Sequence, residues 1–103
     1  MDFSKLGGLI PAVIQDAHTS EVLMVGFMNE QALAETRRTG YATFFSRSRK
    51  ALWMKGETSG NKLEVLAILV DCDEDTVLLK VRRLGVGNVC HTGQRTCFYR
   101  SLD

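Results

Sequence analysis

Hydrophobic and polar positions along the chain predict several short strands and one helix. Segments 10–15 and 21–28 are rich in Val, Ile, Leu and Phe, and the polar residues between them favour a turn, so the two segments are predicted to form a hairpin. The further expected strands are 41–46, 63–70, 76–82 and 97–102. The nearly all-apolar segment 63–70 is typical of a strand buried on both faces, whereas the alternation in 76–82 predicts one buried face.

The helix is predicted between Asn29 and Gly40. Asn29 is a favourable N-cap, Glu30 adds negative charge to the first turn, and two arginines add positive charge to the last turn. Gly40 is typical of the residue that ends a helix. One short helix with five or six strands predicts a small α+β domain with a mostly antiparallel β-sheet.

Composition narrows the class of protein further. The chain has 103 residues, of which 45% are hydrophobic and 24% charged, with a formal net charge of +1. These values predict one soluble globular domain and do not favour binding to nucleic acid or to a membrane surface. The longest apolar run, 6–14, contains two glycines and a proline and is too short to span a bilayer. Three cysteines without an export signal favour the reducing cytoplasm.

The most unusual segment is the acidic run from Asp71 to Asp75, which follows an apolar strand. If the backbone stays extended, Asp71, Asp73 and Asp75 point to one side and Cys72 to the other. The three carboxylates suit a hard cation such as Mg²⁺, whereas a calcium loop is excluded because the required glycine and glutamate are absent. A solvated acidic turn is the alternative.

The cysteines form a second candidate site. The spacing of Cys72, Cys90 and Cys97 matches neither a C-x-x-C redox pair nor a four-ligand zinc finger. Three thiolates would leave one coordination position of a zinc ion open, as in catalytic zinc sites, and His91 is the adjacent candidate base. The alternative is that the cysteines fill the core as small hydrophobic residues. The polar, glycine-containing loop 85–97 favours the zinc hypothesis.

Segment 46–61 is dense in groups that bind anions. The candidate substrate-binding residues are Arg47, Arg49, Trp53, Lys55, Glu57, Thr58, Ser59 and Gly60. Arginine pairs with phosphate in a bidentate manner, and the backbone N–H groups of a Gly, Ser and Thr loop can cradle a phosphate. Trp53 is either a core residue or a surface on which a base stacks. A solvated hairpin tip is the alternative for the whole segment.

Four segments in this order and spacing, 46–49, 53–60, 71–75 and 90–100, resemble the phosphoribosyl-AMP cyclohydrolase family. The resemblance covers nearly the whole chain, which is expected to be a single cyclohydrolase domain, 1–103. It implies hydrolysis of the N1–C6 bond of the adenine ring in 1-(5-phosphoribosyl)-AMP. The product would be the formimino aminoimidazole carboxamide ribonucleotide of histidine biosynthesis. The chain ends at Asp103, so we expect the form without a fused pyrophosphohydrolase domain.

The resemblance also implies two metals and a homodimer. By motif position the zinc ligands are Cys72, Cys90 and Cys97, and the magnesium ligands are Asp71, Asp73 and Asp75. Both subunits are expected to contribute thiolates to each zinc site. We expect His91 to take the proton from the attacking water or to deliver it to the leaving nitrogen. The alternative functions are a small zinc-stabilised nucleic-acid or protein interaction module and, less favoured, a redox-thiol protein.

Overall fold

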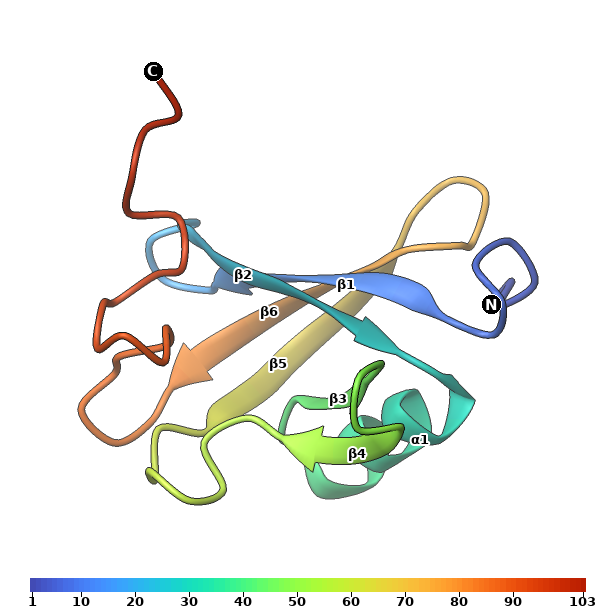
Figure 1. The fold of residues 1–103 in the computed structure, drawn as a ribbon, viewed down its shortest axis with the longest axis horizontal. Helices are drawn as coiled ribbons and strands as arrows, with labels where there is room; N and C mark the ends of the chain where they lie inside the picture. The colour runs from blue at the N-terminus through green and yellow to red at the C-terminus, as the bar shows by residue number, and fades with distance from the viewer.

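The computed structural model describes residues 1–103 and contains one helix and six strands. The elements are β1 (Ile10–Asp16), β2 (Val22–Met28), α1 (Glu30–Thr39), β3 (Thr43–Ser46), β4 (Ala51–Met54), β5 (Leu63–Val70) and β6 (Val77–Arg83). Four strands form a sheet in the order β2-β1-β6-β5, and β3 and β4 form a separate hairpin. The hairpin and α1 lie on one side of the sheet (Figure 1).

The sheet is mostly antiparallel, as predicted. β1 pairs with β2, and β5 with β6, in antiparallel registers, whereas β1 and β6 run parallel. The parallel pair arises because the chain leaves the sheet after β2, forms α1 and the β3–β4 hairpin, and returns as β5 at the far edge. The α+β class is therefore confirmed.

The predicted helix boundaries are also confirmed. The side chain of Asn29 accepts a hydrogen bond from the Ala32 N–H (2.8 Å), and Gly40 adopts a left-handed conformation (φ 82°) while its N–H donates to the Thr36 carbonyl. The Thr36 hydroxyl accepts from the Thr43 N–H (3.0 Å), which fixes the start of β3 against α1. The structure contains no helix that is both long and apolar enough to cross a membrane.

The hydrophobic core lies between the sheet and the layer formed by α1 and β3. Alternate residues of β1 and β6 point into it, which confirms the one-sided pattern predicted for β6. The largest fully buried side chains include Ile10, Ile14, Leu23, Met28, Phe44, Leu63, Leu79 and Val81. The core therefore packs against only one face of the sheet.

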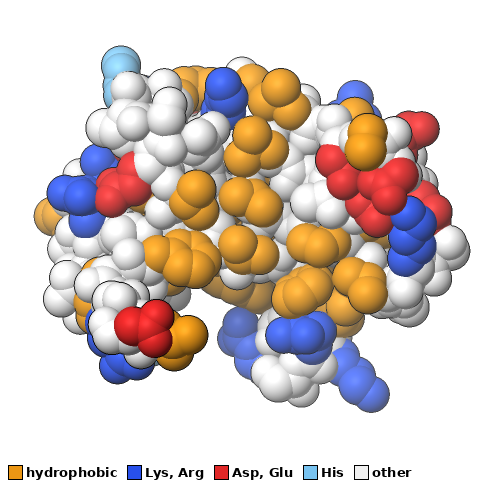
Figure 2. All heavy atoms as spheres, turned by 90° about the horizontal axis from the view of Figure 1, so that it is seen from above, with side chains coloured by type: hydrophobic (Ala, Val, Ile, Leu, Met, Phe, Trp, Pro, Cys, Tyr) orange, Lys and Arg blue, Asp and Glu red, His pale blue; other side chains and the backbone are white.

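The expectation that 63–70 is buried on both faces is wrong for the single chain. Leu63 is buried, but Leu66, Leu69 and Val70 are 55%, 45% and 50% exposed. The reason is that β5 is an edge strand and no element of the chain packs on the sheet face opposite α1. Hydrophobic side chains accordingly form a broad exposed surface there (Figure 2).

The strand expected at 97–102 is likewise absent. The Cys97 N–H donates to the Leu23 carbonyl (2.8 Å), but the segment continues away from the sheet without further ladder bonds (Figure 1). Its side chains after Cys97 are exposed, so no burial compensates for ordering a strand. β4, by contrast, was not predicted, because four residues flanked by basic and polar ones give too short a pattern.

Candidate functional site

A pocket of about 480 Å³ lies between the segment that includes and follows β4 and the loop that follows β6. It is lined by six of the predicted substrate-binding residues, namely Arg49, Trp53, Lys55, Glu57, Thr58 and Ser59. Cys90 and His91 line the opposite wall. The fold thus brings the basic segment and part of the cysteine loop together, although 30 or more residues separate them in the sequence.

The two walls of the pocket are held together by Asn61, which the sequence did not single out. Its side-chain oxygen accepts a hydrogen bond from the Val86 N–H (3.0 Å). Gly85 lies against this oxygen in a left-handed conformation (φ 66°), and an added Cβ would collide with it. The available signal was the final Asn of the Gly-Glu-Thr-Ser-Gly-Asn run, but its partner lies 25 residues away.

The pocket carries positive charge without an ion-pair partner. Arg49 and Lys55 line it, and neither forms a salt bridge, whereas five other basic side chains of the chain do. The Lys55 Nζ lies 5.9 Å from the centroid of the Trp53 ring, and Trp53 also packs at 5.0 Å against Phe44 of the core. Trp53 is therefore both a core residue and a pocket wall, and the pocket is suited to an anionic ligand.

Two predicted substrate residues do not line this pocket. The Arg47 guanidinium lies 4.2 Å from the centroid of the Phe27 ring, in a separate hollow on another side of Trp53. Gly60 closes the adjacent loop, since its N–H donates to the Gly56 carbonyl (2.8 Å). Arg47 and Gly60 thus flank the pocket rather than form its wall.

The loop from Cys90 to Cys97 folds back on itself. The Cys90 N–H donates to the Gln94 carbonyl (3.0 Å), and the Gly93 N–H donates to the Cys90 carbonyl (2.9 Å). Each of the two thiols lies close enough to the other to affect its pKa. The loop therefore places Cys90 in the pocket wall with Cys97 near it, although Cys97 itself does not line the pocket.

The two thiols differ in acidity. Hydrogen bonds from the hydroxyl and then the N–H of Thr92 lower the pKa of Cys90, whose Sγ lies 3.0 Å from the Thr92 Oγ1. Burial raises the pKa of Cys97, and the neighbouring Cys90 raises it further. Cys90 is therefore the thiol that ionises first. A pair of sulfur donors of this kind fits a soft or borderline ion such as Zn²⁺.

β2 and Glu21, the residue before it, anchor the C-terminal half of this loop. Arg95 forms a two-pronged ion pair with Glu21, with both N···O distances at 2.9 Å. The Thr96 hydroxyl donates to the carbonyls of Val22 and Leu23 at 2.9 and 3.1 Å. These contacts fix the position of Cys97 relative to the sheet.

A buried carboxylate anchors the segment that leads into the loop. Asp16 is 5% exposed and pairs with Arg83 (2.9 Å), whose guanidinium also donates to the Gly87 carbonyl (3.1 Å). Burial alone would raise the pKa of Asp16, but the N–H groups of Thr19 and His18 and the charge of Arg83 outweigh it and lower the pKa. The network connects β1 and β6 to the backbone that approaches Cys90.

Cys72 lies far from the other two cysteines. It is exposed in the turn between β5 and β6, while the loop that carries Cys90 follows the opposite end of β6. The seven residues of β6 alone span roughly 23 Å at the usual rise per residue. One chain therefore brings together two of the three predicted zinc ligands, with His91 exposed beside them.

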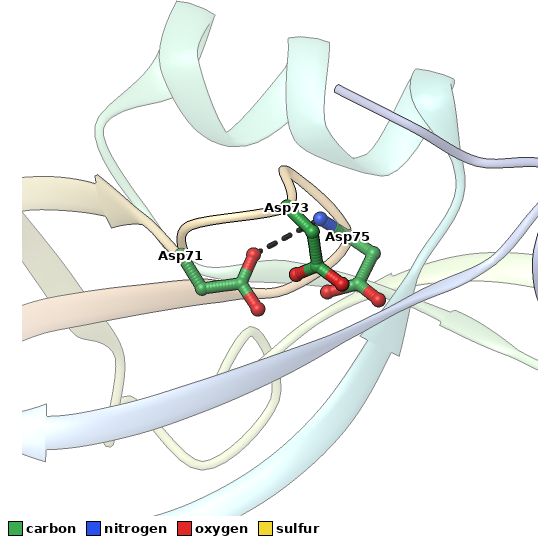
Figure 3. Close-up of side chains that lie close together, drawn as sticks. All are labelled: Asp71, Asp73 and Asp75. Atoms are coloured by element: carbon green, nitrogen blue, oxygen red, sulfur yellow. Dashed lines mark hydrogen bonds between the residues drawn. The ribbon is translucent and has the colours of Figure 1, made fainter.

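The three aspartates converge on one point. One carboxylate oxygen from each of Asp71, Asp73 and Asp75 lies within 4.8 Å of the others (Figure 3). The backbone does not stay extended here: Asp71 Oδ1 accepts from the N–H groups of Asp75 (3.0 Å) and Thr76 (3.2 Å), and Glu74 has a φ of 61°. A tight turn, rather than strand alternation, gathers the oxygens. Three hard donors in this space fit a cation such as Mg²⁺.

The carboxylates of this acidic turn are not equivalent. The Lys5 ammonium, 3.0 Å from Asp75, is the main cause that lowers the pKa of Asp75 to about 2. Partial desolvation raises the pKa of Asp71, and hydrogen bonding with the Asp75 side chain raises it further. The cluster thus concentrates negative charge and already attracts one cation, the Lys5 side chain.

Comparison with known proteins identifies the family. The family model described as phosphoribosyl-AMP cyclohydrolase matches residues 24–99. A phosphoribosyl-AMP cyclohydrolase of Desulfatibacillum aliphaticivorans is 55% identical over 103 residues, covering 100% of this chain and 82% of the relative. Those of Pelobacter propionicus and Geobacter sulfurreducens are 59% and 58% identical over 99 residues, covering 96% of this chain and 78% of each relative.

These matches favour the enzyme over the alternative of a zinc-stabilised interaction module. They extend across both walls of the pocket, the acidic turn and all three cysteines. The chain therefore belongs to the phosphoribosyl-AMP cyclohydrolase family, whose members are hydrolases of a cyclic amidine in histidine biosynthesis.

Proposed function

We propose that the chain hydrolyses the N1–C6 bond of the adenine ring in 1-(5-phosphoribosyl)-AMP. The observation that carries this proposal is the single pocket in which Cys90 and His91 face the unpaired cations of Arg49 and Lys55. Such a pocket offers a site for ring chemistry next to a site for phosphate. Substitution at N1 makes C6 electrophilic. Water supplies the oxygen of the new carboxamide, one of its protons goes to the exocyclic nitrogen, and the other goes to N1 as the N1–C6 bond breaks.

His91 is the proposed proton carrier. It is exposed at the pocket wall next to Cys90, so it can reach both solvent and a bound ring. An imidazole exchanges protons near neutral pH, which suits removal of a proton from water and its delivery to the leaving nitrogen. This role requires the ring to lie between His91 and Trp53 in the pocket.

Cys90, Cys97 and a Cys72 from a second copy of the chain are proposed to hold zinc. The pairing of the first two thiols and the remote position of the third support this arrangement. When bound, Zn²⁺ supplies a Lewis acid that lowers the pKa of water to roughly 7. The chain's own contribution is the anchored loop, which places Cys90 in the pocket wall beside His91 and keeps Cys97 near Cys90.

The proposed assembly is a homodimer formed through the open face of the sheet. A groove of about 390 Å³ on this face is lined mainly by apolar side chains of β1, β5 and β6, including Val13, Leu69 and Leu78. A sheet with one face in water normally carries polar residues on that face. The groove ends at Asp71, adjacent to Cys72. A second copy that covers the groove therefore brings the acidic turn and Cys72 to the interface.

The acidic turn is proposed to hold Mg²⁺ for the substrate phosphates. Because Asp71 and Asp73 flank Cys72, any partner surface that receives Cys72 also receives these carboxylates. Magnesium is typically held by one or two carboxylates together with substrate phosphates. Arg49, Lys55 and the loop 58–60 would then bind phosphate from the other side of the pocket.

The direct test is a spectrophotometric assay of purine-ring opening on the N1-ribosylated nucleotide. We expect turnover with the metal-containing protein, loss of turnover after chelation, and its return when Zn²⁺ is restored in the presence of Mg²⁺. A Cys90→Ser variant treated in the same way should stay inactive, because a hydroxyl is a poor zinc ligand. Full turnover after complete removal of zinc would contradict the proposed metal chemistry, and an inert zinc-loaded protein would contradict the reaction.

A further inference from the structure

The N-terminal segment lies against the acidic turn. The Lys5 Nζ is 2.8 Å from Asp73 Oδ2 and 3.0 Å from Asp75 Oδ2. The Asp2 N–H donates to the Glu74 carbonyl (2.6 Å), and the N-terminal ammonium lies 3.9 Å from the Glu74 carboxylate. Figure 1 shows the N-terminus beside the turn between β5 and β6. Residues 1–5 are therefore attached to the turn through charge and one backbone hydrogen bond, while Phe3 packs against the hydrophobic core.

We propose that Lys5 is an internal cation that competes with the divalent ion for Asp73 and Asp75. In this way Lys5 sets the metal affinity of the acidic turn and couples metal binding to release of the N-terminal segment. The inference rests on the magnesium site of the proposed function. It concerns how strongly the site binds and what moves when it does.

Competition follows from the shared oxygens. A divalent ion that contacts all three carboxylates must lie at 2.0–2.6 Å from its oxygen ligands, depending on the ion. The Lys5 ammonium already contacts two of these carboxylates, and no other basic side chain of the chain pairs with them. An ammonium and a divalent ion on the same oxygens repel each other at short range. Binding of the metal therefore requires Lys5 to leave.

The cost of displacing Lys5 is modest. Its side chain is 45% exposed and that of Asp73 is 55% exposed, so the freed ammonium passes directly into water. Exposed ion pairs are weak, and the loss of two of them corresponds to about a three- to tenfold change in a binding constant. Lys5 therefore weakens metal binding without preventing it.

The coupling also acts in the reverse direction. If Lys5 weakens metal binding by a given factor, the metal weakens the attachment of Lys5 by the same factor. The attachments that remain for the segment are the packing of the half-buried Phe3 against the core and a few hydrogen bonds, such as Asp2 N–H to the Glu74 carbonyl (2.6 Å) and Gly8 N–H to the Phe3 carbonyl (2.8 Å). We infer that metal binding loosens residues 1–5 while the sheet is unaffected.

Calorimetric titration of the zinc-loaded protein with Mg²⁺ tests the competition. Lys5→Met should tighten Mg²⁺ binding about three- to tenfold relative to wild type. Lys5→Arg, which keeps the charge, should remain near wild type. Lys50→Met is the matched control, because Lys50 is exposed in the turn between β3 and β4 and forms no ion pair, so it should change the constant less than twofold. An unchanged constant in Lys5→Met, or equal tightening in Lys5→Arg, would overturn the proposal.

Limited trypsin digestion gives a readout of the release. Mg²⁺ should speed cleavage after Lys5 severalfold relative to cleavage after Lys50, which lies exposed in the turn between β3 and β4. The effect should saturate at the Mg²⁺ concentration found by calorimetry. Slowing of both cleavages to the same extent would indicate general stabilisation and would contradict the release of the segment.

The same titrations separate this inference from the proposed function. If no variant binds Mg²⁺, the magnesium site of the proposed function fails and the inference fails with it. If Mg²⁺ binds to Lys5→Met and to wild type with the same constant, the site stands and the competition alone is wrong.

Discussion

The acidic turn and the cysteine loop achieve ligand convergence in different ways. Asp71, Asp73 and Asp75 are two residues apart and meet through one turn, whose contacts with the rest of the fold come from the N-terminal segment. The cysteines meet only in part: two share a loop that β2 anchors, and the third lies at the other end of β6. Hard oxygen donors are thus gathered by local sequence, whereas one chain brings together only two of its three sulfur atoms.

The largest expected effect tests directly whether the three cysteines of one zinc site come from two chains. Cys72→Ser and Cys90→Ser should each reduce turnover by about 10³-fold or more, because each removes a ligand of the proposed zinc. When the two inactive variants are unfolded together and refolded as an equal mixture, half of the dimers are mixed and each has one intact site. Turnover should then return to about a quarter of the wild-type value.

Two controls accompany this mixing experiment. Each variant refolded alone should remain inactive, and wild type refolded in the same way gives the reference value. Absence of any recovery in the mixture, with mixed dimers present, would mean that the three sulfurs come from one chain and that the separation of Cys72 seen in this structure is not the working state.

A second prediction tests the role of His91, which lies in the cysteine loop. His91→Ala should lower kcat by about 10²-fold, the usual scale for loss of a general acid or base, while the zinc content stays at the wild-type level. His18→Ala is the control, since His18 lies in the turn between β1 and β2, outside the pocket. Turnover of His91→Ala equal to that of wild type would exclude the proton role.

The smallest expected effect concerns the buried ion pair between Asp16 and Arg83, which anchors the segment that leads into the cysteine loop. Asp16→Asn removes the charge that pairs with Arg83, and it should lower the free energy of unfolding at pH 7 by about 1–3 kcal/mol. The pKa of Asp16 is lower in the folded protein than its usual value of 3.8. The ionised carboxylate therefore stabilises the fold above about pH 3.8, and this stabilisation is lost as the pH falls through the pKa of the folded state. The difference between variant and wild type should therefore shrink below pH 4.

Denaturant unfolding at pH 7 and pH 3 measures this difference. Glu35→Gln is the comparison variant, because its pair with Arg38 is solvent-exposed and should contribute much less to the free energy of unfolding than the Asp16 pair does. A destabilisation of Asp16→Asn that persists undiminished at pH 3 would indicate lost packing rather than lost charge.

Local features of the fold could be predicted from the sequence. Asn29 and Gly40 mark the helix because capping depends on neighbours three or four residues away, and the alternation in β6 reports its one buried face. β5 was misjudged for an instructive reason. Its apolar residues indicate a cover on both faces, but the chain itself covers only one.

The site was predictable in its residue types but not in its geometry. The spacing of Asp71, Asp73 and Asp75 suggested convergence by alternation, whereas the positive φ of Glu74 produces it by a turn. The role of Asn61 could not be predicted, because its partner, Val86, is distant in sequence and no local pattern indicates such a contact. Arg47 belongs to the same basic segment as Arg49 but faces Phe27 instead.

The position of Trp53 supplies a built-in optical reporter. It is the sole tryptophan of the chain, and its indole lies between Phe44 of the core and the pocket. Fluorescence excited at the red edge of protein absorption therefore originates from one place, the wall against which a purine would rest. Occupancy can be followed by quenching or a spectral shift without a label, even in variants that no longer turn over.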